Sequence, residues 1–155
     1  MPEKKIRRGD PYQAQCEKTS ALIAEATDIP NLDWQICYQS RVGPLKWIGP
    51  STQEALARAA LDHVPVVIYP PAFVSEHVET LVEIEHEYRD RANKLGVPAF
   101  ARAETVMTHP RFIEGLAQMV RDACGRAPGT VAPAGGLCQC GSARQCPMFI
   151  QGVKK

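Results

Sequence analysis

The stretch Tyr69–Asp90, YPPAFVSEHVETLVEIEHEYRD, constrains the fold of this chain more than any other. An apolar run ends at Pro70-Pro71, a polar break follows at Ser75, and the rest is predicted to be a helix unusually rich in acids. At about 100° per residue, one arc of roughly 100° collects the acidic side chains and a histidine. Its members are Glu76, Glu79, Glu83, His86, Glu87 and Asp90. The apolar residues of the helix take the other side: Val78, Leu81, Val82, Ile84 and Tyr88.

An acidic arc of this kind is most often a solvated face. Two features favour a functional site instead. The arc follows a buried-looking strand, where α/β folds place their sites, and His77 lies in its first turn. Carboxylates in a row beside a histidine could bind or conduct a divalent cation, or accept protons from a substrate.

Composition narrows the class of protein. The chain has 155 residues, 45% of them apolar and 23% charged, which predicts one soluble globular domain. A net charge of +1 gives no reason to expect nucleic acid or an anionic membrane as partner. We expect no membrane-spanning segment and no export signal, because no window reaches about 18 apolar residues and MPEKKIRRGD lacks an apolar core. Six cysteines without such a signal predict free thiols or metal ligands in the cytoplasm.

Helices and strands are predicted to alternate along the chain. Helix signals are an N-cap at Asp10-Pro11 with Gln13 in a capping box, a second capping box of Ser51 with Glu54, and Pro110 at a first helical position. The predicted helices end before Pro30, near Asp62, after Asp90 and near Cys124. The predicted strands are Trp34–Tyr38, Val64–Tyr69 (a buried parallel strand) and Pro98–Val106. This order predicts an α/β domain of three layers around a short parallel sheet of about three strands. Such a domain looks incomplete, and a loop-like tail follows from Ala127.

The segment Phe73–Leu81, with Glu83, Glu87 and Tyr88 after it, resembles a signature of the ferrochelatase family, F-x-S-D-H-x-E-T-L-x-E-x-x-x-E-Y. The chain departs from that signature only in having Glu76 where the family usually has Asp.

Three further segments extend the resemblance. Arg8–Tyr12 is similar to the family's R-G-D-P-Y motif, and Tyr38–Pro50 is similar to its W-Q-S-K-V-G-P…W-L-G-P loop. His109–Leu116 matches the segment that opens the last helix, so the resemblance runs from Met1 to about Val120.

The resemblance implies a Rossmann-like half-domain over residues 1–125, the C-terminal half of a ferrochelatase, followed by a Cys-rich tail over 126–155. Family members are about twice as long, and Met1-Pro2 looks like the end of the segment that carries their signature histidine. That histidine and the first half would then lie upstream. The implied activity of the intact protein is that of a lyase of haem biosynthesis that inserts Fe²⁺ into a porphyrin, protoporphyrin IX or coproporphyrin III. We expect this half alone to be inactive, and peripheral membrane association stays open.

The resemblance also implies residue roles on the acidic helix. His77 and Glu79 would be the catalytic pair, accepting protons or passing the metal, and Glu83 and Glu87 would extend the pair into a path for protons or ions. Oxygen ligands suit transient handling of Fe²⁺. On an ideal α-helix His77 lies about 160° from Glu79, but the family's helix contains a π-type turn, which would re-aim it.

Two residues of the Gly/Pro-rich loop are candidates for porphyrin contact. Trp47 would pack against the porphyrin face, although simple core packing is the commoner role of a lone Trp. Arg41 would pair with a propionate, a role that suits its guanidinium, or it is a surface arginine.

The tail carries a cysteine constellation, Cys138, Cys140 and Cys146. Many ferrochelatases hold a [2Fe–2S] cluster with C-terminal cysteines. The spacing here differs from the vertebrate C-x-x-C-x-x-x-x-C, whereas bacterial members have tighter spacing. The resemblance implies a cluster with Cys124, or a cysteine of the other half, as fourth ligand, while zinc and idle thiols stay open. The remaining thiols, Cys16 and Cys37, lie in apolar patterns and are predicted to be buried.

Two other classes of protein remain as alternatives. One is a non-catalytic porphyrin- or Fe–S-binding module that pairs with a separate partner half. The other is a zinc-stapled interaction domain, which explains the tail but leaves Glu79, Glu83 and Glu87 without a role.

Overall fold

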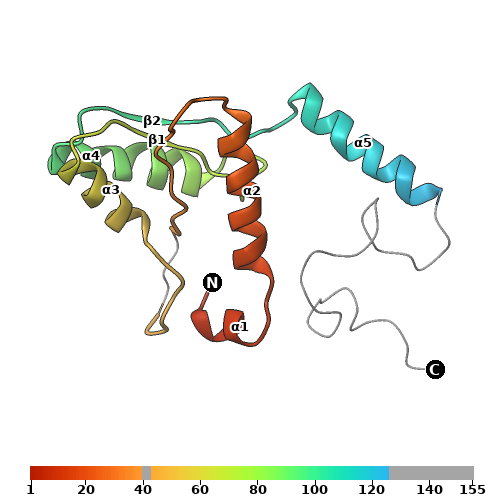
Figure 1. The fold of residues 1–155 in the computed structure, drawn as a ribbon, viewed down its shortest axis with the longest axis horizontal. Helices are drawn as coiled ribbons and strands as arrows, with labels where there is room; N and C mark the ends of the chain where they lie inside the picture. The colour runs from red at the N-terminus through yellow and green to blue at the C-terminus, as the bar shows by residue number, and fades with distance from the viewer. Residues whose placement is uncertain (40–42, 126–155) are drawn as a thin grey trace.

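The computed structural model describes residues 1–39 and 43–125. It contains, in chain order, α1 (Glu3–Arg7), α2 (Tyr12–Ala26), α3 (Thr52–Leu61), β1 (Val66–Ile68), η1 (Glu79–Tyr88), α4 (Arg89–Leu95), β2 (Phe100–Arg102) and α5 (Pro110–Cys124). The predicted α/β class is confirmed (Figure 1). Within the described part of the chain, no helix is both long and apolar enough to cross a membrane.

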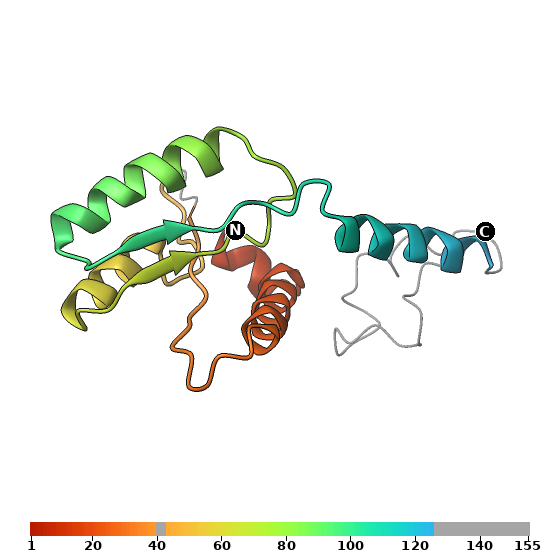
Figure 2. The same ribbon diagram turned by 90° about the horizontal axis from the view of Figure 1, so that it is seen from above.

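The sheet has two parallel strands, β1 and β2, with Val66 opposite Phe100 and Ile68 opposite Arg102. The rod formed by η1 and α4 lies along one side of this sheet (Figure 2). The core is a single cluster of buried side chains, with Val66 and Ile68 packed against it: Leu56, Ile84, Tyr88, Ala92, Val97 and Phe100. Val67 points the other way and is 73% exposed, so the prediction of a buried strand is wrong for this face of β1.

The strand predicted over Trp34–Tyr38 is absent. Tyr38 makes one isolated parallel bridge to Ser51, with its N–H donating to the carbonyl of Pro50 at 2.9 Å. The pairing does not continue, because Ser51 is the N-cap of α3 and the backbone is helical from Thr52 on. The described residues therefore form a sheet of two strands, one fewer than predicted.

Local signals determine where the helices begin. The predicted capping box of α3 is present, since Ser51 Oγ also accepts from the N–H of Glu54 at 3.2 Å. Pro110 is the first residue of α5, as predicted. At α2 the carboxylate of Asp10 accepts from the N–H of Tyr12 at 3.0 Å, but Gln13 bonds Glu17 rather than closing a capping box. The charged segment before it forms the short helix α1, which the sequence did not predict.

The acidic stretch forms one continuous helix that is π-helical in its first part and α-helical in its second. η1 is π-helical for ten residues, with i→i+5 hydrogen bonds, and continues directly into α4. The π-type turn implied by the family resemblance is therefore confirmed, and it is longer than a single turn. α4 ends at Gly96, whose φ of 82° lies in the left-handed region. Glycine adopts this conformation without steric cost because it has no Cβ. The turn returns Val97 to the core, with its N–H donating to Ala92 at 3.0 Å.

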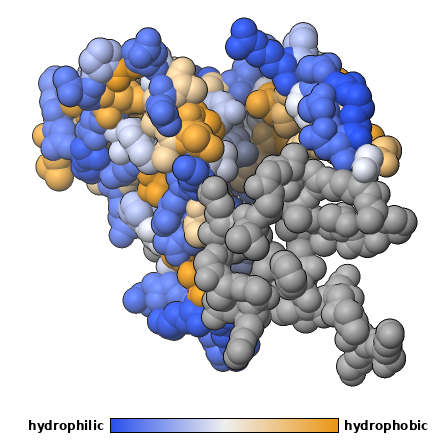
Figure 3. Space-filling model, turned by 45° about the vertical axis from the view of Figure 1, so that its right-hand side comes forward, coloured by the Kyte–Doolittle hydropathy of each residue, from blue (hydrophilic) through white to orange (hydrophobic). Residues whose placement is uncertain are grey.

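α5 projects away from the sheet in both views (Figures 1 and 2). It contains no buried residue, and its apolar side remains largely exposed, with Met119 at 68% and Val120 at 62%. On the face seen in Figure 3, exposed apolar residues lie among polar ones.

Candidate functional site

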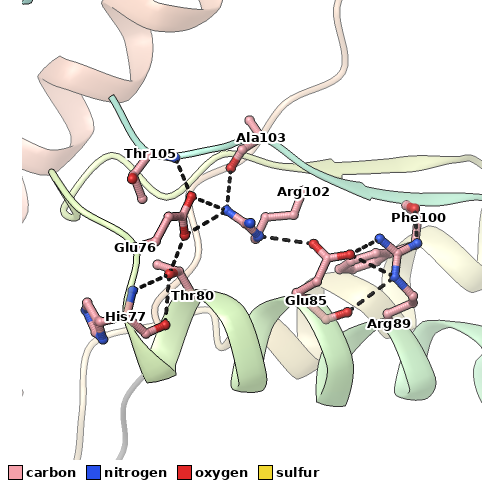
Figure 4. Close-up of polar contacts among 9 residues, drawn as sticks. All are labelled: Glu76, His77, Thr80, Glu85, Arg89, Phe100, Arg102, Ala103 and Thr105. Carbon is pink, nitrogen blue, oxygen red and sulfur yellow. Dashed lines mark hydrogen bonds and ion pairs between the residues drawn. The ribbon is translucent and has the colours of Figure 1, made fainter. Parts of the chain in front are cut away.

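A partly buried ionic network connects η1 and the residues just before it to the end of β2 (Figure 4). Its centre is Arg102, the last residue of β2, whose side chain is 7% exposed. Its Nη1 donates to both carboxylate oxygens of Glu76, at 2.9 and 3.2 Å, and its Nε donates to Glu85 at 3.1 Å. Nη1 also donates to the carbonyl of Ala103 at 3.1 Å. One guanidinium thus joins two carboxylates that lie in and just before the helix.

Glu76 faces this network and does not belong to the acidic arc predicted for it. Besides Arg102, its carboxylate accepts from the hydroxyl of Thr80 at 2.5 Å and from the N–H of Thr105 at 2.9 Å. Hydrogen bonds from Thr80 and Thr105, and then the Arg102 charge, lower the pKa of Glu76 to about 2. The prediction was wrong because Glu76 precedes the helix proper, where an ideal α-helical wheel does not apply.

Glu85 and Arg102 are the residues that sequence reasoning missed. Glu85 also accepts from Nε of Arg89 at 3.2 Å and forms an ion pair with its Nη2; these bonds and those from Arg102 lower its pKa. Arg89 in turn donates to the carbonyl of Phe100 at 2.8 Å and lies 5.1 Å from the centre of its ring. A signal existed: Arg102 lies inside the strand predicted over Pro98–Val106, and an arginine that a sheet buries needs counter-charges, which the acidic helix could supply.

Thr80 links this network to the catalytic candidates. It is completely buried, and its hydroxyl accepts from the N–H of His77 at 3.0 Å while it bonds Glu76. The carbonyl of His77 accepts from the N–H groups of Thr80 and Leu81, at 3.1 and 2.9 Å. The backbone of His77 is therefore held from both sides, although its side chain points away from Arg102 (Figure 4).

The imidazole of His77 is oriented by two contacts. Its Nδ1 accepts from the N–H of Glu79 at 3.1 Å, and its ring packs edge-on against Phe73 at 4.7 Å between centroids. An atom that accepts an N–H bond carries no proton, so the neutral ring holds its proton on Nε2. In this arrangement neutral His77 presents a hydrogen-bond donor, not a lone pair, to the open side.

The outer side of η1 carries the remaining acidic candidates. Glu79 and Glu83 are partly exposed and Glu87 is exposed. Glu83 accepts from the hydroxyl of Tyr88 at 3.2 Å, and burial together with the Glu83 charge raises the pKa of Tyr88 to about 12. Glu87 lines a cleft of about 240 Å³ beside α4. Among the described residues, no three His, Cys, Asp or Glu side chains lie close enough together to hold a metal ion.

The apolar side chains of the same helix do not all pack inward. Ile84 and Tyr88 are buried as predicted, whereas Val78 is 71% exposed and Leu81 and Val82 are 45% exposed each. The wider π-helical turn rotates these residues out of the stripe expected for an α-helix.

Of the porphyrin-contact candidates, Trp47 is described. It is half-buried, pairs with Pro2 in an isolated antiparallel bridge, and lines a cleft of about 440 Å³ whose other walls are Glu3, Gly43, Leu45, Lys46, Gly49, Pro50 and Glu54. Arg41 lies outside the described residues.

The thiols are only partly described, since Cys138, Cys140 and Cys146 also lie outside the described residues. Cys124 is an exposed free thiol, and Cys16 and Cys37 are half-buried rather than fully buried. Burial raises the pKa of the Cys37 thiol, whose Sγ lies 3.7 Å from the hydroxyl of Thr52.

These features define an α/β protein whose polar side chains gather where parallel strands end and the next helix begins. The family model for ferrochelatase matches residues 1–124. The ferrochelatase of Caulobacter vibrioides is 52% identical over 148 residues, which cover 95% of this chain and 42% of that protein. The ferrochelatase of Hyphomonas neptunium is 46% identical over 144 residues (91% and 40%), and that of Wolbachia pipientis is 50% identical over 119 residues (77% and 37%). The chain belongs to the ferrochelatase family, and it spans about two fifths of the length of these relatives.

Proposed function

We propose that this chain is the C-terminal half of an enzyme that inserts Fe²⁺ into a porphyrin, protoporphyrin IX or coproporphyrin III, in haem biosynthesis. The observation that carries the proposal is the His77–Glu79 pair at the mouth of a π-helix, in a chain 52% identical to a ferrochelatase. π-helical turns are rare and are found frequently at functional sites.

The reaction exchanges one Fe²⁺ for two pyrrole protons, so the site needs bases facing the macrocycle. Glu79 is the proposed first acceptor, because neutral His77 already carries a proton on the nitrogen that faces outward. Glu83 and Glu87 lie one and two steps of four residues further along the helix and would pass protons or the metal onward. Carboxylate oxygens suit transient handling of Fe²⁺, since thiolates would hold it more tightly.

The porphyrin is proposed to contact the loop before α3. The half-buried indole of Trp47 lines a cleft of about 440 Å³, and an apolar ring suits one face of the macrocycle. Arg41 is proposed to pair with a propionate.

The finer architecture is also a proposal: a Rossmann-like, three-layer half-domain over residues 1–125, with a Cys-rich tail over 126–155. The exposed face of β1 at Val67 supports it, because a parallel sheet is normally covered on both faces. An incomplete sheet is one reason to expect that the chain alone does not insert iron. The cleft would need the N-terminal half, which is the proposed partner.

A chimera tests the function directly. The part of this chain that aligns with the Caulobacter vibrioides ferrochelatase replaces the matching part of that enzyme, and Fe²⁺ insertion is followed by porphyrin fluorescence loss. We expect activity within about tenfold of the Caulobacter enzyme, since uncoupled substitutions in a shared fold have small effects. The isolated chain of 155 residues serves as the inactive control. A folded chimera without activity would overturn the proposal.

The second candidate, a porphyrin-binding module without catalysis, is favoured by the open cleft at Trp47. It predicts that the isolated chain binds protoporphyrin and that Trp47→Ala weakens this binding. A chimera that binds porphyrin and never inserts iron would select this alternative.

A [2Fe–2S] cluster on Cys138, Cys140 and Cys146, with Cys124 or a cysteine of the other half as fourth ligand, is a separate proposal. Three thiols within a short sequence support it, and Cys124 is accessible. Iron with acid-labile sulfide in the purified chain would support the cluster, whereas zinc alone would replace it. The cytoplasmic location and peripheral membrane association stay predictions.

A further inference from the structure

Arg102 is a buried charge for which the proposed chemistry gives no reason. Its guanidinium reaches Glu76 before η1 and Glu85 within η1. Removing a partner from a buried ion pair is costly, and buried pairs are often no more stabilising than apolar residues of the same volume. Stability alone therefore does not account for this arrangement, which points to a role in geometry.

The shape of arginine suits such a role. The guanidinium is a planar fork with fixed donor directions, so it sets the separation of the two carboxylates that it joins. Those carboxylates lie on either side of the wide first turns of η1. A π-helix is rare and short in proteins, and it persists where surrounding contacts hold it. Arg102 provides that contact from β2.

Hydrogen bonds through Glu76 and Thr80 connect Arg102 to the proposed catalytic pair, His77 and Glu79. Glu76 is adjacent to His77 and bonds the Thr80 hydroxyl, which accepts from the N–H of His77. Glu79 lies between His77 and Thr80 and donates its N–H to the imidazole. Moving the Glu76 carboxylate away from Arg102 would shift each of these groups.

We propose that Arg102 is a positioning residue for iron insertion, which fixes the wide turn of η1 through Glu76 and Glu85 and so aims His77 and Glu79. This inference rests on the proposed function for its kinetic readout. It names no contact between Arg102 and substrate.

The chain offers a matched control. Arg58 of α3 also joins two carboxylates, those of Asp33 and Asp62, but its side chain is 45% exposed and it lies outside the Arg102 network. A lysine at either position keeps the positive charge but lacks the planar guanidinium that bonds two carboxylates in fixed directions. The four variants are Arg102→Lys, Arg102→Met, Arg58→Lys and Arg58→Met.

In the active chimera, kcat and KM for porphyrin are measured well below the unfolding temperature of every variant. We expect Arg102→Lys to lower kcat at least about tenfold and Arg102→Met about 100-fold, with KM nearly unchanged, because a small misplacement of reacting groups has effects of this size. Both Arg58 variants should stay within about twofold of the parent. If Arg102→Met fails to fold, Glu85→Gln replaces it, with a smaller expected fall in kcat.

A second readout does not depend on activity. Amide hydrogen exchange at Glu79 and Thr80 should accelerate at least about tenfold in Arg102→Lys and remain unchanged in Arg58→Lys, since those amides bond groups of the held turn. Unchanged exchange together with unchanged kcat per folded molecule would overturn the positioning role, even if Arg102→Lys melts earlier. An inactive parent chimera would instead overturn the proposed function, and the exchange data would still decide the role of Arg102.

Discussion

The face of η1 turned toward β2 and the face turned toward solvent satisfy their polar groups in different ways. On the inner face Glu76 and Glu85 each accept from more than one donor, and Arg102 is 7% exposed. On the outer face Glu83 bonds one tyrosine hydroxyl and Glu87 is exposed. The same side-chain chemistry therefore builds a fixed frame on one side and leaves carboxylates that are at least partly exposed on the other.

The difference between the two faces of η1 indicates which of its acidic side chains are structural and which are candidates for function. Charge alone does not separate frame from site, because both faces are acidic. On the inner face, Arg102 pairs with Glu76 and Glu85, and Arg89 pairs with Glu85. A carboxylate paired in this way stays ionised and is a poor proton acceptor, whereas an unburied one can exchange protons.

The largest expected effect falls on the outer face. In the chimera, Glu79→Gln should lower kcat by about 10²–10⁴-fold, because glutamine cannot accept a proton. The melting temperature should stay nearly constant, and Glu25→Gln on the exposed side of α2 is the control. If Glu79→Gln keeps full activity, the outer face is not the proton-accepting side.

The inner face should respond in stability. Glu76→Gln should lower the free energy of unfolding of the full chain by about 1–3 kcal/mol at pH 7, since its donors lose a charged acceptor. The pKa of Glu76 is lowered from 4.5 to about 2 in the folded chain, so its ionised form contributes stability above about pH 4.5. That contribution is lost as the pH falls through about 2. Denaturation curves of parent and variant should therefore converge in this window, and a constant difference down to pH 2 would contradict the assignment.

Thr80 tests the link between the two faces. Thr80→Val keeps the shape and removes the hydroxyl that joins Glu76 to the N–H of His77. The unpaired groups should cost about 1–2 kcal/mol of stability. Thermal melts should reveal the loss, and kcat should fall less than in Glu79→Gln. A stable variant with normal kcat would mean that the two faces are independent.

The smallest effect is spectroscopic. Nitrogen chemical shifts of His77 in labelled chain at pH 8 should report an unprotonated Nδ1 and a protonated Nε2, because Nδ1 accepts from the N–H of Glu79. His63 and His109 provide reference signals in the same spectrum. The opposite tautomer at His77 would restore it as a candidate proton acceptor.

Much of the fold followed from local signals in the sequence. The Ser51–Glu54 capping box and Pro110 fixed where α3 and α5 begin, and the apolar run before Tyr69 predicted β1. The signature around His77 and Glu79 identified the family, which the comparison with relatives confirmed. These features depend on residues a few positions apart, so a linear reading captures them.

Tertiary contacts decided what the sequence could not. Glu76 turned inward because Arg102, far along the chain, lies opposite it on β2, and a helical wheel contains no such neighbour. Val78, Leu81 and Val82 became exposed because the turn of η1 is π-helical over its length. Trp34–Tyr38 did not become a strand because Ser51 was already committed to capping α3. The sequence by itself determined the family to which the chain belongs. The packing of β2 against η1 decided which acids of this stretch pair with Arg102, since hydrogen-bond partners come from wherever the fold brings them.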